Sequence, residues 1–155
     1  MSESQPNVPK RSCVTAKIST KSKKADGHKL MLAKLATSLL GPNDAEALAM
    51  RVADLDELRA LGLPDVLAFE IPYFRADGAE SGFKRWRYLE DTRRGFAVST
   101  DAKTARYVQP GDTMPEAYLP PLVDWLKVQR DPTLPLVVTE GELKAAKSCA
   151  EGFPT

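Results

Sequence analysis

The sequence predicts an α+β protein, and three patterns along the chain predict it. Leucines recur at helical spacing between residues 28 and 62, apolar and charged residues alternate within 67–89, and an apolar run at 136–138 leads into another helical pattern. The first pattern predicts helices, the second an antiparallel hairpin and the third a buried strand followed by a helix. We therefore expect a small helical lead-in, a basic antiparallel sheet and the first β-α unit of an α/β layer.

Length and charge limit how the chain can be organised into domains. With 155 residues, of which 43% are hydrophobic, the chain is long enough to bury the core of one domain. The net charge of +1 argues neither for nor against nucleic acid. The charge is uneven, however: bases dominate the amino terminus and 84–106, whereas acids dominate 44–80. The lysine-rich, aromatic-free residues 1–27 are predicted to be a disordered tail.

Residues 28–62 form the predicted helical lead-in. A first helix carries a leucine stripe that Gly41-Pro42 interrupts, and Asn43 is the expected cap of a second helix. A third helix is expected to begin after Asp54 and to end at Gly62. A leucine stripe usually packs into a core, although a partner-binding surface stays open as an alternative reading.

Residues 63–131 are predicted to form a basic antiparallel β subdomain. The runs 67–74 and 82–89 should pair as a hairpin, with Pro72 at an edge or a strand end because it lacks an N–H group. Alternation puts Arg85 and Arg87 on one face and Trp86 and Tyr88 on the other. We expect the aromatic residues to fill the core and the arginines to project outward.

Shorter sequence patterns predict the elements in the second half of this subdomain. A short strand is expected at 106–112, an extended piece at Tyr118 and Leu119, and an amphipathic helix at 121–129. Together with Arg106, an outward arginine row would suit the phosphates and bases of a single-stranded nucleic acid. The alternative is a solvated strand face whose arginines pair with Glu90, Asp91 and Asp101.

Residues 132–155 place two carboxylates at a predicted junction between strand and helix. Glu140, Gly141 and Glu142 follow the apolar run 136–138, and the helical pattern after them ends at Gly152. Ligands often bind where strands of an α/β sheet end, so this junction is a candidate site. The structural alternative is that the acids complement the helix dipole, with Thr139 or Glu140 as the cap.

Several classes of protein are excluded by missing motifs. The sequence contains no Gly-Lys-Ser/Thr phosphate loop, no G-x-S-x-G elbow, no H-E-x-x-H and no G-x-G-x-x-G. Cys13, Cys149 and the lone His28 are too few for a structural zinc site, which needs four ligands. No secretory or membrane-length apolar segment is present, so we expect a cytoplasmic protein with no membrane partner.

An ordered series of short motifs resembles the toprim-like domain of unknown function found in phage and plasmid primases and primase-helicases. The series comprises FEIPYFRADG at 69–78, RWRYL at 85–89, RYVQPGD at 106–112, YLPP at 118–121, TEGELKA at 139–145 and GFP at 152–154. It covers somewhat more than half of the chain, and its order is more specific than any single motif. The resemblance concerns only the amino-terminal part of such proteins.

The resemblance implies a fold and a setting. Residues 132–155 would begin a toprim-like (Rossmann-like) layer that is incomplete in this chain. The protein would be the amino-terminal portion of a primase-like enzyme acting on DNA in the replication of a phage, plasmid or other mobile element. Its implied partners are DNA, chiefly single-stranded, and a helicase domain or subunit. The alternative function is a non-catalytic single-stranded nucleic-acid-binding remnant or accessory protein.

The resemblance also implies roles for individual residues. Glu140 would be the general acid/base, Glu140 and Glu142 would hold Mg²⁺ or Mn²⁺ if a complete toprim site forms, and Gly141 and Lys144 would contact the cofactor. Nucleic acid would meet Arg85, Arg87, Arg106 and Gln109. Lys144 stands where the usual EGxxD pattern has an aspartate, and the aspartate pair of the family would lie beyond Thr155. Whether the chain is an enzyme therefore stays open, because two carboxylates are few for a hard cation.

Overall fold

The computed structural model describes residues 20–64, 66–89 and 106–155, and within them it is an α+β protein. In chain order the elements are α1 (Thr20–Ala36), α2 (Pro42–Ala47), β1 (Arg51–Val52), α3 (Leu55–Ala60), β2 (Ala68–Phe74), β3 (Glu80–Tyr88), β4 (Tyr107–Val108), α4 (Trp125–Arg130) and α5 (Glu142–Ala150). The strands form one antiparallel sheet in the order β1-β2-β3-β4. The predicted class and hairpin are confirmed. Strand β1 was not predicted, because two residues are too few to show alternation.

The β2–β3 hairpin is the centre of the sheet and fixes which residues share a face. Its register pairs are Ala68 with Tyr88, Phe69 with Arg87, Glu70 with Trp86, Ile71 with Arg85, Pro72 with Lys84 and, after a register shift, Phe74 with Glu80. Directly opposed residues of an antiparallel pair lie on the same face. Strand β1 pairs only with Phe69 and Glu70, so Pro72 lies beyond the end of β1 and is locally at an edge.

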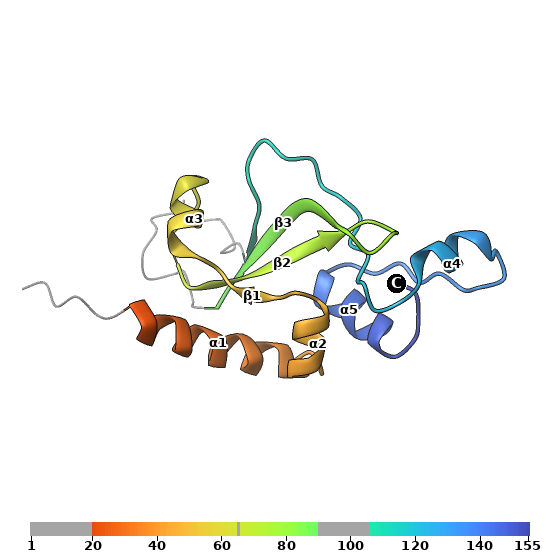
Figure 1. The fold of residues 1–155 in the computed structure, drawn as a ribbon, viewed down its shortest axis with the longest axis horizontal. Helices are drawn as coiled ribbons and strands as arrows, with labels where there is room; N and C mark the ends of the chain where they lie inside the picture. The colour runs from red at the N-terminus through yellow and green to blue at the C-terminus, as the bar shows by residue number, and fades with distance from the viewer. Residues whose placement is uncertain (1–19, 65, 90–105) are drawn as a thin grey trace, which may run out of the picture.

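The larger core lies between one face of the sheet and the helices α1, α2 and α5, and Figure 1 shows α1 running along this side. Its buried members are Met31, Leu35, Leu40, Ala45, Leu48, Met50, Phe69, Ile71, Tyr73, Phe83, Leu143 and Ala146. Burial of such side chains is the main favourable term in folding. This face also carries Arg85 and Arg87, because they oppose Ile71 and Phe69.

A smaller core covers the opposite face. Trp86 is 2% exposed and packs with Ala53, Leu58 and Ala68, so that α3 lies over this side of the sheet (Figure 1). The prediction that Trp86 fills the core is therefore confirmed. The prediction that Arg85 and Arg87 project outward is wrong. Alternation separates two sets of residues but does not say which face is covered, and here both faces are.

Helix α1 starts earlier than the sequence patterns indicated. It begins at Thr20, inside the stretch 1–27 that was predicted to be a disordered tail; residues 1–19 lie outside the described residues. Gly27 is buried where α1 approaches β1, and a Cβ atom there would lie 2.9 Å from Val52 Cγ1. Glycine normally disfavours a helix interior, but it allows this close approach.

The helix starts of the lead-in are partly as predicted. Asp54 caps α3, since its Oδ1 accepts a hydrogen bond from the Asp56 amide at 2.8 Å. The cap of α2 is Gly41 and not Asn43, because Pro42 occupies the first turn, where a missing N–H costs no bond. The Asp44 side chain accepts from the Gly41 amide at 2.7 Å and completes this helix start.

The predicted buried strand at 136–138 is absent. Leu136 and Val138 are 60% and 89% exposed, and the segment has no strand structure. One backbone bond, from the Val137 amide to the Pro154 carbonyl at 2.9 Å, joins it to the last residues. A strand requires a ladder of such bonds, and an apolar run does not show whether a neighbouring strand exists to supply it.

Helix α5 follows as predicted and ends before Gly152, which has φ of +87°. Its cap is Gly141, at φ of +89°, so neither Thr139 nor Glu140 caps it.

Helix α4 begins at Trp125, later than the predicted 121, because Asp124 caps it by accepting from the Lys127 amide at 3.0 Å. Residues 118–119 form no strand. Among the described residues, no helix has the length and apolarity that crossing a membrane requires.

Candidate functional site

A buried carboxylate at the start of α5 joins that helix to the central hairpin. Glu142 is only 3% exposed, and its Oε1 accepts hydrogen bonds from Tyr73 Oη at 2.8 Å and Arg85 Nη1 at 2.5 Å. Its other oxygen, Oε2, is buried and has no hydrogen-bond partner among the described residues. The guanidinium compensates the buried charge, which would otherwise be costly to remove from water.

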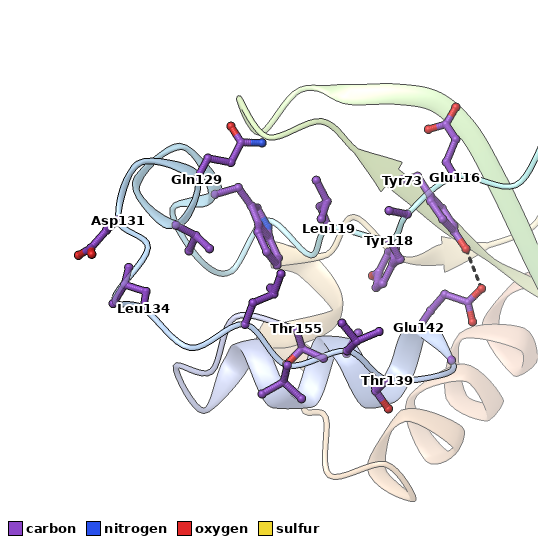
Figure 2. Close-up of a pocket in the computed structure, with 18 of the residues that line it drawn as sticks. Tyr73, Glu116, Tyr118, Leu119, Gln129, Asp131, Leu134, Thr139, Glu142 and Thr155 are labelled. Carbon is purple, nitrogen blue, oxygen red and sulfur yellow. Dashed lines mark hydrogen bonds between the residues drawn. The ribbon is translucent and has the colours of Figure 1, made fainter.

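A cavity of about 710 Å³ lies beside this ion pair. Figure 2 shows Tyr73, Tyr118 and Glu142 gathered at one end of it, and Gln129, Asp131 and Leu134 at the other. The remaining wall is mainly apolar and comes from α4, α5 and the segment 134–139. The volume is in the range of small-molecule sites, which also combine apolar walls with a few polar groups.

Burial perturbs the phenols around this cavity. The pKa of Tyr118 is raised well above its usual value, first by burial and then by the nearby Glu142 carboxylate. The pKa of Tyr73 is raised by burial and by its hydrogen bond to Glu142. Burial alone raises the pKa of Tyr88 on the opposite face of the sheet. All three groups are therefore held in the neutral form.

These raised pKa values predict loss of stability at alkaline pH. The unfolded tyrosines lose their protons from about pH 10 upward, whereas the folded ones retain them, so the folded state binds more protons and its stability falls as pH rises. We expect absorbance at 295 nm to show most tyrosine ionisation coinciding with the unfolding seen by circular dichroism. Tyrosine ionisation completed near pH 10 in a still folded chain would contradict this assignment.

A second feature, which we call the basic cluster, consists of Lys34 on α1, Arg87 on β3 and Arg106 before β4. Burial lowers the pKa of Lys34, and the positive charges of Arg87 and Arg106 lower it further, so both guanidinium groups act electrostatically on this ammonium group. The Arg87 guanidinium lies over the Tyr107 ring, 4.6 Å from its centroid, and that of Arg85 lies 5.3 Å away. Among the described residues, no acid pairs with the basic cluster.

The predicted site residues are only partly brought together. Arg87 and Arg106 both act electrostatically on Lys34, whereas Arg85 pairs with Glu142. Gln109 donates to the Thr113 carbonyl at 3.3 Å and so holds a turn. Sequence reasoning missed Lys34, because nothing in a helical lysine indicates which distant strand it will approach. The alternative partners Glu90, Asp91 and Asp101 lie outside the described residues.

The residues predicted to hold a metal do not form a joint site. The Glu140 side chain is 93% exposed and pairs with Lys144 Nζ at 3.3 Å, while Glu142 is buried and bonded to Arg85. In the part of the chain that the structure describes, no group of three or more His, Cys, Asp or Glu side chains is arranged to hold a metal ion. A hard cation requires several oxygen ligands, so Glu140 and Glu142 do not fit one here.

Comparisons of the chain with protein-family models, with curated proteins and with solved structures gave no match.

Proposed function

We propose that this chain binds single-stranded nucleic acid through the basic cluster, as the amino-terminal portion of a primase-like protein acting on DNA. The binding proposal is supported by Lys34, Arg87 and Arg106, three cations that have no acidic partner among the described residues and of which the two arginines act electrostatically on the lysine. Holding like charges together is unfavourable, and an anionic ligand would relieve that cost.

The chemistry of the cluster matches a single strand better than an isolated anion. Lysine and arginine neutralise phosphates, and the half-buried Tyr107 ring, which the 9% exposed Arg87 covers, places an aromatic group beside these cations. Arg106 is exposed and so is available to a ligand. The roles of two predicted contacts change in this proposal. Glu142 neutralises Arg85, which supports the Tyr107 ring, and Gln109 shapes the neighbouring turn.

The primase-like setting rests on the ordered motifs in the sequence, and the catalytic part of the resemblance receives less support. Glu140 is accessible, but the carboxylate predicted to share a metal with it is buried and bonded to Tyr73 and Arg85. A joint Mg²⁺ or Mn²⁺ site would require Glu142 to leave those partners. We therefore assign binding, and not nucleotidyl transfer, to the described residues.

Neutralising the basic cluster tests the binding proposal. The triple variant Lys34→Gln, Arg87→Gln, Arg106→Gln should weaken binding of a fluorescein-labelled oligo-dT by about thirtyfold or more in an anisotropy titration at low salt. Because each lost phosphate contact removes a released counterion, the slope of log K against log salt should become shallower by about 2.

A matched control separates contact from overall charge. The variant Arg75→Gln, Lys127→Gln, Arg130→Gln removes the same charge from residues that are exposed and outside the cluster, so its affinity should fall by less than about threefold. Equal losses in the two triple variants, or a parent affinity that does not depend on salt, would overturn the proposal. Circular dichroism of each variant establishes that the comparison is made between folded chains.

A further inference from the structure

We propose that the cavity beside α4 is a docking groove for a segment of a partner protein, one whose apolar side chains are flanked by lysine or arginine. An apolar wall, open backbone groups and acidic side chains at both ends of the groove together indicate this partner. No residue of the basic cluster lines the groove, so the docking site does not depend on the proposed binding of nucleic acid.

The wall formed by residues 136–138 is apolar and open to solvent. Leu136, Val137 and Val138 all line the cavity, yet they are 60%, 43% and 89% exposed. The apolar surface of Val138 therefore extends beyond the cavity itself. Trp125 adds a ring that is held in place, because its Nε1 donates to the Pro120 carbonyl at 2.7 Å. Neighbouring exposed apolar side chains of this kind mark a surface that a partner covers.

The same wall offers backbone groups to a partner chain. The Val137 amide bonds to the Pro154 carbonyl at 2.9 Å, whereas Leu136 and Val138 form no backbone hydrogen bond among the described residues. Backbone groups of this kind are satisfied by water or by another chain. A polypeptide that is added along an open segment pairs with them, while its side chains enter the neighbouring groove. The wall therefore favours a polypeptide over an isolated aliphatic ligand.

The charges of the lining favour basic residues in that polypeptide. Of its four charged side chains, Arg85 and Glu142 form an ion pair with each other. Glu116 and Asp131 have no ion-pair partner among the described residues, and Figure 2 shows them at opposite ends of the cavity. Lys127 acts electrostatically on Asp131 but is not part of the lining. The net negative charge favours a cation on either side of an apolar segment and disfavours an anionic partner.

Fluorescently labelled peptides of equal length test the chemistry of the partner. KRLVVLRK has basic flanks and an apolar centre, EDLVVLDE has acidic flanks, and KRSGGSRK keeps the basic flanks without the apolar side chains. In anisotropy titrations, KRLVVLRK should bind about tenfold more tightly than either of the other peptides. Equal affinity for the first two peptides would contradict the selection by charge, and absence of KRLVVLRK binding at millimolar concentration would overturn the docking site.

A charge variant tests the two ends of the groove. Glu116→Gln combined with Asp131→Asn should weaken KRLVVLRK about fivefold and make its binding less dependent on salt. The matched control, Glu46→Gln with Asp112→Asn, removes the same charge from exposed residues outside the lining, so the affinity should change by less than about twofold. Equal losses in both variants would attribute binding to the overall charge of the protein and remove the case for a groove.

An apolar variant tests the wall. Leu136→Ser combined with Val138→Ser should weaken KRLVVLRK about tenfold and leave the chain folded, because both side chains are already exposed. The matched control is Leu39→Ser with Met114→Ser, at residues that are 74% and 82% exposed and outside the lining. This control should leave the affinity unchanged within about twofold. If it weakened binding as much as the wall variant, the peptide would be held by general surface hydrophobicity.

A second copy of the chain is the alternative occupant of the groove, and sedimentation equilibrium without peptide distinguishes it from a partner. We expect the parent chain to sediment as a monomer over the concentrations used in the titrations. A concentration-dependent dimer that the Leu136→Ser, Val138→Ser variant abolishes would assign the groove to self-association and overturn the proposal.

Discussion

Replacing Glu142 with alanine is expected to lower the free energy of unfolding by about 3 kcal/mol, among the largest effects of any single substitution in this chain. The carboxylate is buried and accepts from both Tyr73 and Arg85. Its removal leaves a phenol without its acceptor and a half-buried guanidinium without its counter-charge. Arg85 retains some access to water, which keeps the cost at the lower end of the range for breaking buried pairs.

Two further variants separate the components of this effect in urea denaturation. Tyr73→Phe removes one donor but leaves the ion pair, so it should cost about 1 kcal/mol. The double variant Glu142→Ala, Arg85→Met leaves no guanidinium unpaired. Its loss of free energy of unfolding should therefore be smaller than the sum of the losses of the two single variants. A cost below about 1 kcal/mol for Glu142→Ala, or strict additivity of the pair, would contradict a buried ion pair at this position.

The parts of the fold that the sequence predicted depend on local signals. The β2–β3 hairpin follows from alternation on either side of a turn that contains Gly78, and α5 follows from helical spacing that ends at Gly152. Asp54 caps α3 because its short side chain reaches an amide two residues away. These features need no knowledge of distant parts of the chain.

The parts that failed depend on distant neighbours. The segment 136–138 has the composition of a buried strand, yet within the described part of the chain a single backbone bond, to Pro154, joins it to another segment. Arg85 and Arg87 alternate with Trp86 as predicted, but both faces of the sheet are covered, so alternation alone could not assign the arginines to solvent. The face that a strand residue occupies follows from the register of the sheet, and the acid that pairs with Arg85 on this face, Glu142, is far along the sequence.

In the candidate site, too, local patterns predicted individual residues, whereas contacts between distant residues could not be predicted. The sequence identified Arg87, Arg106 and Glu142 as residues of interest from their types and motifs. It could not show that the charges of the two arginines act on Lys34, or that Glu142 is bonded to Arg85 and Tyr73. Arg85 contacts Glu142 beside the cavity and lies near Tyr107, where Arg87 of the basic cluster stacks, so β3 carries residues of both the ion pair and the basic cluster.

Trp86→Ala is the second substitution with a large expected effect, about 3–5 kcal/mol of unfolding free energy. Trp86 is 2% exposed and packs with Ala53, Leu58 and Ala68, and the partly buried Leu55, Leu63, Tyr88 and Val108 surround this core. These side chains can fill only part of the space left by a deleted indole, so a cavity should persist.

The hydrogen-bonding state of the ring refines this prediction. Trp86 Nε1 is buried without a partner among the described residues, so Trp86→Phe loses packing but no hydrogen bond and should cost clearly less than Trp86→Ala. Tyr88→Phe, which removes another unpaired polar atom from this face, should be neutral within about 0.5 kcal/mol. Urea denaturation of the three variants gives the order. If Tyr88→Phe cost as much as Trp86→Ala, the smaller core would be held by a polar contact of Tyr88 and not by the packing of Trp86.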